Sequence, residues 1–393
     1  MELMRSHLGP RRAEQSDAQI AIAAWLIACC TLVFAMVAVG GVTRLTHSGL
    51  SIVEWAPIVG TIPPLTETQW LETFAKYQQT PEFRLVNHAM SVDEFKGIFW
   101  WEYFHRLLGR MIGFVFLLPL IWFALRRRID RRLGLALAGI FLLGAAQGAM
   151  GWYMVKSGLV DDPRVSHFRL TAHLGLAFLI FAAMLWVALD QFRAGATRNR
   201  PPSAADPARG VRRLAWWVTG VTAYMVLTGG LVAGIRAGYA YNTFPLMNGY
   251  LVPPEIAMIS PWWKNFFYNM ATVQFDHRLG AWALAFLVPL LWLRLRRAAG
   301  AVDSRARLDG EPALAAAASR SGLLLGLLAV QITLGISTLL TGVAVPLAVA
   351  HQAMAVIVFA AALAVSHALS AAPAQPAATG SVQPLLPDGS TPC

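Results

Sequence analysis

The 393-residue chain is 56% hydrophobic and only 13% charged, and it contains 14 Trp and 20 Phe residues. Several apolar runs reach the length of about 20 residues that a membrane-spanning helix needs. This composition excludes an ordinary soluble globular protein and predicts an all-α integral membrane protein. The formal net charge of +11 does not indicate nucleic-acid binding, because the arginines are clustered in short segments between the apolar runs.

Apolar length predicts eight transmembrane helices in chain order. Their expected ranges are 20–42, 105–125, 133–153, 170–190, 214–236, 275–293, 321–342 and 346–369. The segment 191–213 is rich in Pro, Ala and Arg and is predicted to be a linker. The Ala- and Pro-rich tail 370–393 is predicted to be disordered.

The positive charges predict the orientation of these helices. Alternate segments hold 20 of the 32 Lys and Arg residues, namely 1–19, 126–132, 191–213, 294–320 and 370–393. By the positive-inside rule these segments are cytoplasmic, which places both termini in the cytoplasm. The long loops 43–104 and 237–274 then face outward. We expect a multi-pass protein of the cell inner membrane, in contact with lipid.

An internal repeat divides the predicted helices into two halves. The sequence EYFHRLLG from Glu102 matches QFDHRLG from Gln274, and Gly40 and Gly151 match Gly229 and Gly335 in the same order. Because each half has four helices, the two halves run parallel. The sequence therefore predicts two pseudo-twofold-related four-helix bundles, 20–190 and 214–369, with an axis along the membrane normal.

Four histidines occupy matched positions in this topology. His105 and His277 are expected to begin the second helix of each half, and His173 and His351 to lie near the start of the fourth. Each of these helices runs from outside to inside, so all four imidazoles should lie at the outer end. Two imidazoles on facing helices of a bundle suit the axial positions of haem iron. Interhelical hydrogen bonding is the simpler alternative for a single membrane histidine.

An acidic residue distinguishes the first half from the second. Glu102 lies three residues before His105, which on a continuous helix places both on one face. This carboxylate could orient a ligand or accept a proton. The alternative is a helix N-terminal acid that interacts with the helix dipole. The matching position in the second half is Gln274, so only the first half carries the acid.

Basic residues near the histidines offer partners for haem propionates. Arg106, Arg110 and Arg278 are expected in the first turns of their helices, and arginine suits carboxylate binding. Snorkelling of these side chains to lipid headgroups is the alternative. Four further histidines, His7, His47, His88 and His167, are expected outside the helices, while His367 is unmatched near the inner end of the last one.

The motifs resemble the haem A synthase family of cytochrome oxidase assembly. The matching stretches include EFKGIFWWEYFHRLLGR from Glu94, SHFRLTAHL from Ser166, VQFDHRLGA from Val273 and LAVAHQAMA from Leu347. Together with three further blocks they run in order from Gly40 to Ala355. The chain is most similar to the branch shared by alphaproteobacteria and mitochondria, which lacks a cysteine pair in the outer loops.

The resemblance implies a reaction and a set of site residues. The family oxidises the C8 methyl group of haem O to a formyl group through successive hydroxylations, with water as the oxygen source, and supplies haem A to cytochrome c oxidase. Haem b would be bound by His277 and His351, and the substrate haem by His105 and His173. Glu102 matches the family's essential acid.

Two other functions remain open from the residues alone. A non-catalytic di-haem membrane electron-transfer protein would need the paired histidines but no acid beside one pair. A transporter with parallel repeats would use the histidines and Glu102 as a proton relay. The sequence also leaves open the electron acceptor, formation of a homo-oligomer, and direct delivery of substrate by a haem O synthase (protohaem farnesyltransferase).

Overall fold

The computed structural model describes residues 10–55, 59–160, 162–194, 209–300 and 312–370. Regular structure in these residues is helical, apart from an isolated bridge between Met247 and Tyr250. Eight of the described helices are long and apolar enough to cross a membrane. The predicted all-α membrane protein with eight spans is therefore confirmed. The expectations for residues 1–9, 195–208 and 371–393 fall outside the described residues.

Each predicted span overlaps one long helix. These helices are α2 (Pro10–Leu45), α5 (Val92–Leu125), α6 (Arg131–Lys156), α7 (His167–Ala194), α8 (Arg209–Gly234), α10 (Met270–Gly300), α12 (Pro312–Leu340) and α13 (Val345–Leu369). The connections contain α3 (Glu67–Tyr77), α4 (Pro81–Leu85), α9 (Asn265–Tyr268) and the 3-10 turns η1 (Val59–Thr61), η2 (Ala237–Tyr239), η3 (Pro254–Ala257) and η4 (Trp262–Lys264).

The start of α5 differs most from the prediction. Hydropathy predicts a helix from residue 105, whereas α5 begins at Val92. Ser91 caps it, because its side chain accepts from the Glu94 backbone amide while the Glu94 carboxylate accepts from the Ser91 amide. The added turns bury aromatic side chains, including Phe95 and Phe99, against α3. Packing outside the membrane thus extends the helix beyond its apolar run.

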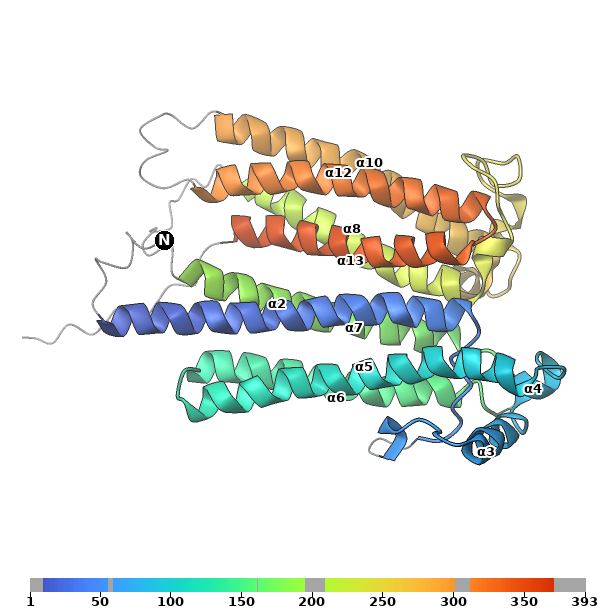
Figure 1. Ribbon diagram of the computed structural model, residues 1–393. Helices are drawn as coiled ribbons and strands as arrows, with labels where there is room; N and C mark the ends of the chain where they lie inside the picture. Colours follow the sequence, from blue (N-terminus) through green and yellow to red (C-terminus); the bar gives the residue numbers. More distant parts are fainter. Residues whose placement is uncertain (1–9, 56–58, 161, 195–208, 301–311, 371–393) are drawn as a thin grey trace, which may run out of the picture.

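The long helices are arranged in two groups (Figure 1). Helices α2, α5, α6 and α7 lie together, as do α8, α10, α12 and α13. The start of α2 and the end of α13 lie at one end of the molecule, and α3 and α4 lie at the other, beside the loop that follows α8. The division into two domains and the pseudo-twofold axis stay predictions.

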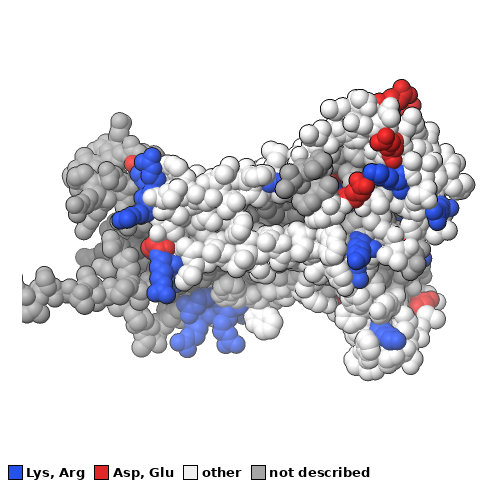
Figure 2. Space-filling model, turned by 90° about the horizontal axis from the view of Figure 1, so that it is seen from below, with Lys and Arg blue, Asp and Glu red and all other residues white. Residues whose placement is uncertain are grey.

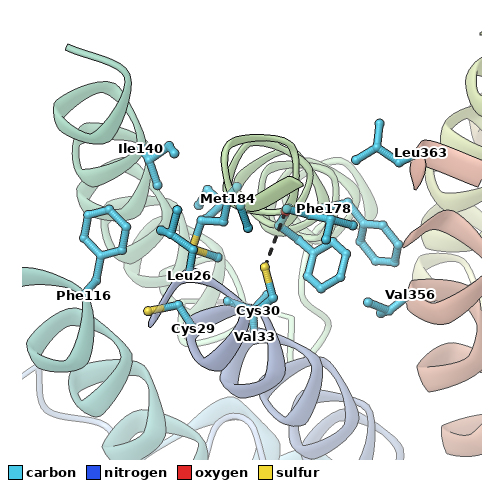
Figure 3. Close-up of a cluster of buried hydrophobic side chains, with 14 of the residues drawn as sticks. Leu26, Cys29, Cys30, Val33, Phe116, Ile140, Phe178, Met184, Val356 and Leu363 are labelled. Carbon is cyan, nitrogen blue, oxygen red and sulfur yellow. Dashed lines mark hydrogen bonds between the residues drawn. The ribbon is translucent and has the colours of Figure 1, made fainter. Parts of the chain in front are cut away.

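Helix α2 joins the two groups through a shared core (Figure 3). Its Leu26, Cys30 and Val33 belong to one buried cluster that also contains Phe178 of α7 and Val356 of α13. A second cluster is built from α8, α10, α12 and α13. Since the first cluster includes residues from α13, the halves share apolar contacts over the length of α2.

Charged side chains on the face shown in Figure 2 gather near the two ends of the long helices, and the band between them is mostly uncharged. Such a band matches the hydrocarbon core of a bilayer, which is about 30 Å thick. The distribution supports a multi-pass membrane protein whose loops lie on either side of the bilayer.

Candidate functional site

The four matched histidines all lie on long helices. His173 and His351 lie near the starts of α7 and α13, as predicted. His105 and His277, however, do not begin their helices, because α5 and α10 start at Val92 and Met270. The prediction that these two residues open a helix is wrong. Both are held on both sides by helical backbone, which fixes the direction of their side chains.

Each of the four imidazole rings packs against a glycine of a neighbouring helix. In the first half, a Cβ added at Gly40 would lie 2.9 Å from His105 Cε1, and one added at Gly151 would lie 3.1 Å from His173 Cε1. In the second half, a Cβ added at Gly229 would lie 3.3 Å from His277 Cε1, and one added at Gly335 would lie 2.8 Å from His351 Cε1. Gly40 and Gly229 were aligned by the sequence repeat, as were Gly151 and Gly335. The same close approach of glycine and imidazole therefore recurs in matched positions of the two halves, and a side chain at these glycines would displace the rings.

The second-half rings are oriented by hydrogen bonds at Nδ1. The Thr228 hydroxyl donates to the Met225 carbonyl oxygen at 3.2 Å, so it accepts from His277 Nδ1 at 2.9 Å. His351 Nδ1 donates to the Gln331 carbonyl oxygen at 3.2 Å. With both protons on Nδ1, both Nε2 lone pairs are available to a metal ion.

The spacing of these two rings fits axial ligation of one iron. Their centroids are 6.5 Å apart and their planes are inclined by 80°. Imidazole nitrogens bind metals at about 2.0 Å, which puts the centres of two rings on opposite sides of one ion roughly 6 Å apart. The separation of the His277 and His351 rings therefore matches that of two imidazoles on opposite sides of one metal ion.

The first-half rings are held less completely. Nδ1 of His105 and of His173 is buried without a hydrogen-bond partner. The Gln147 amide nitrogen lies 3.3 Å from His173 Nε2 and donates to the His173 carbonyl oxygen at 3.1 Å. A buried polar nitrogen without a partner costs about 1–3 kcal/mol, and no hydrogen bond at Nδ1 fixes the tautomer of either ring. A metal at His173 Nε2 would displace the Gln147 amide.

Glu102 is the centre of a buried hydrogen-bond network and is only 2% exposed. Its Oε2 accepts from Ser51 Oγ and from the Ile52 amide, both at 2.7 Å. Its Oε1 accepts from Arg106 Nε at 3.0 Å and Nη2 at 2.7 Å. The interpretation of Glu102 as a helix-end acid is wrong, because α5 begins at Val92. The carboxylate instead ties the segment after α2 to the turn that carries His105.

The second half repeats this arrangement with an amide. Arg278 Nη2 donates to Gln274 Oε1 at 3.0 Å, and Gln274 Nε2 donates to the Ala237 carbonyl oxygen at 2.9 Å. Arg106 and Arg278 each also donate to carbonyl oxygens of the loop that follows the first helix of their half. Both arginines, expected near haem propionates, thus hold these loops in place.

Comparison with known proteins identifies the family. The COX15-CtaA family, described as cytochrome oxidase assembly protein, matches residues 23–363. The chain belongs to this family. Three relatives named "Heme A synthase" are similar along nearly their whole length. The protein of Nitrosospira multiformis is 58% identical over 370 residues, covering 94% of this chain and 99% of the relative.

The other two relatives are more distant. The protein of Nitrosomonas eutropha is 54% identical over 349 residues, covering 89% of this chain and 94% of the relative. The protein of Rhodospirillum centenum is 47% identical over 351 residues, covering 89% of this chain and 88% of the relative. The resemblance to the haem A synthase family is confirmed. These relatives give no support to a non-catalytic electron carrier.

Of two further histidines of this COX15-CtaA family member, His367 lies near the end of the last helix, as expected, whereas His167 does not lie in a loop. His167 was predicted in a loop, but it is the first residue of α7 and its ring contacts Phe168 and Tyr268. His367 is buried in α13, where its Nε2 lies 2.8 Å from Asp190 Oδ1 on α7. Sequence reasoning missed this pair, although an acid such as Asp190 inside an apolar run was a usable signal. The pair links the two halves at the end far from α3.

Proposed function

We propose that the protein is a haem A synthase, an oxidoreductase that converts the C8 methyl group of haem O into the formyl group of haem A. The observation that carries the proposal is the presence of two buried histidine pairs with different surroundings. The rings of His277 and His351 are oriented by hydrogen bonds at Nδ1. The rings of the other pair have unpartnered Nδ1 atoms, and one of them, His105, follows Glu102 by three residues. The membership in the COX15-CtaA family supports the same reaction.

We assign the second half to a resident haem b held by His277 and His351. The ring separation of 6.5 Å and the hydrogen bonds at Nδ1 support this assignment. Such a haem supplies a one-electron centre when bound. The part of the protein is to hold the two imidazoles in fixed tautomers, which keeps both Nε2 atoms directed at the iron.

We assign the first half to the substrate haem, with His105 and His173 as the residues that bind it. A substrate must enter and leave, so loosely bonded imidazoles suit it better than the fixed pair of the second half. Gln147 can give up its contact with His173 Nε2, so that this nitrogen becomes available to the substrate iron. Gln147 would keep its hydrogen bond to the His173 carbonyl oxygen.

Glu102 takes up protons in this proposal. With water as the oxygen source, the first hydroxylation is R–CH3 + H2O → R–CH2OH + 2 H+ + 2 e−, in which the methyl carbon is oxidised and the electrons leave to the electron acceptor of the oxidoreductase. A second hydroxylation followed by loss of water gives the formyl group. A carboxylate positioned near the reacting group can accept a proton released in such a step, and Ser51, bonded to Oε2, can pass it on.

In this proposal the chemistry takes place on the outer side of the cell inner membrane. The start of α2 and the end of α13 lie together in Figure 1, and the charge distribution of the sequence supports a cytoplasmic location for this end. The histidines of α7 and α13 lie near the opposite ends of their helices. In this proposal, 20–190 forms the substrate half and 214–369 forms the haem b half.

Haem extraction tests the proposed function. The protein is produced in cells with and without a supply of haem O, and the extracted haems are separated and identified by mass. We expect haem A or its hydroxylated precursor beside haem B only when haem O is supplied. Haem B alone under both conditions would contradict the proposal and favour an electron carrier.

A further inference from the structure

A cavity lies beside α4 and the loop between α6 and α7, and Arg236, which follows α8, completes its wall. It has a volume of about 460 Å³, and its charged and titratable lining residues are His47, Glu82, Asp162, Arg164 and Arg236. Its lining also includes Leu85 and Val86, which are exposed, so the cavity opens to the outer solution. The proposed function leaves this cavity without a role.

Glu82 is the unusual residue of this cavity. Its side chain is only 4% exposed, and its Oε2 is buried without a hydrogen-bond partner. A buried acceptor without a donor is costly, and protonation relieves that cost. Glu82 is therefore placed to gain and lose a proton at the cavity wall.

The electrostatic surroundings of Glu82 favour this exchange. Burial and, second, the negative charge of Glu102 raise the pKa of Glu82 to about 7, against smaller opposing effects of Tyr77 and Arg236. Both protonation states are then populated near neutral pH.

The segment from His47 to Ser51 carries buried hydroxyl groups and joins the cavity lining to a hydrogen-bond partner of Glu102. Ser51 donates to Glu102 Oε2 at 2.7 Å, and its backbone amide donates to the Ser48 carbonyl oxygen at 3.3 Å. Ser48 Oγ lies 2.7 Å from Thr46 Oγ1, next in sequence to the cavity residue His47. Ser48 and Ser51 are both buried. One short segment of chain thus carries a partner of the proposed proton acceptor Glu102 at Ser51 and a wall residue of the cavity at His47.

We propose that Glu82 receives the protons collected at Glu102 and releases them into this cavity on the outer side of the membrane. The inference rests on the proposed function, since each hydroxylation by water releases two protons and Glu102 can hold one at a time. Glu82 is protonated when Glu102 delivers a proton and is deprotonated again by cavity water, so no net charge accumulates inside the protein.

The Glu82→Gln variant of the full chain tests the inference, in membranes containing haem O at a series of outer pH values. Glu255 provides a matched control, because it is an outer-loop carboxylate that accepts from Tyr241 at 3.2 Å and lies in the second half. Wild-type conversion should rise with pH through about 7, because only ionised Glu82 accepts protons. E82Q should lower conversion about tenfold or more and lose this pH dependence, as expected for a missing proton acceptor, whereas E255Q should behave as wild type.

A readout independent of turnover is the infrared difference spectrum between acidic and neutral pH, in which E82Q should lack a carboxyl band that the wild type shows. The low-spin haem b spectrum reports whether a variant is folded. If E82Q lacks this spectrum, the Glu82→Asp variant is tested instead of E82Q. Glu82→Asp should shift the carboxyl band and the pH midpoint of conversion. E82Q with wild-type conversion and pH profile, or a folded variant with an unchanged carboxyl band, would overturn the role of Glu82. Absence of haem A from the wild type would instead refute the proposed function.

Discussion

Replacement of Glu102 by glutamine tests the centre of the proposed mechanism. The carboxylate accepts four hydrogen bonds, from Ser51, the Ile52 amide and two nitrogens of Arg106. Glutamine keeps one acceptor oxygen and replaces the other by a donor. In one orientation the new NH2 group faces the Arg106 guanidinium, and in the other it faces the Ile52 N–H. Either orientation sets donor against donor.

The size of the effect follows from these contacts. Hydrogen bonds to charged groups contribute about 1.5–3 kcal/mol each, and at least one is lost. Arg106 keeps its bonds to the Ile52 and Glu54 carbonyl oxygens, so it is not left without a partner. The loss should therefore be smaller than the 3–5 kcal/mol of a completely broken buried pair. We expect local destabilisation of about 2–4 kcal/mol, with the second half intact.

The assay is chromatography of haems extracted from cells that carry Glu102→Gln, together with the haem b spectrum. We expect haem b to be retained and haem A to be absent, with haem O or hydroxylated haem accumulating. Arg106→Gln is the control, because it loosens the same loop but keeps the carboxylate, and it should retain measurable haem A. Wild-type haem A levels in the Glu102 variant would refute proton uptake by Glu102. An equal block in both variants would assign the residue a purely positioning role.

Three further predictions concern the proposed haem b and the topology. His277→Ala or His351→Ala should remove the low-spin haem b spectrum, because iron loses an axial ligand; an unchanged spectrum in both variants would disprove the ligand assignment. Gly335→Ala should lower haem b content, since its Cβ would lie 2.8 Å from His351 Cε1. Gly326→Ala is the control, because its Cβ would meet nothing within 4 Å, and it should leave haem b content unchanged. Equal haem b content in the two variants would argue against the packing role of Gly335. A phosphatase reporter fused at 126–132 should be inactive, because this basic segment is expected in the cytoplasm; an active reporter there would reverse the outward placement of the histidines.

The sequence by itself determined the membrane-spanning architecture. Insertion into a bilayer depends on the length and polarity of each apolar run, which are local properties, so all eight helices could be predicted from hydropathy. The repeated motifs also identified His105, His173, His277 and His351 as a set, because their order and flanking residues recur. The same motifs were specific enough to identify the family.

Only the tertiary structure decided how these residues are held. The partners of Glu102 include Ser51 and Ile52, about fifty positions away in the chain, and the start of α5 is set by packing against α3 rather than by hydropathy. The pairing of each imidazole with a glycine of another helix likewise depends on which helices are neighbours. Hydrogen bonds and close packing join groups that are distant in sequence, so no local pattern specifies them until the chain is folded.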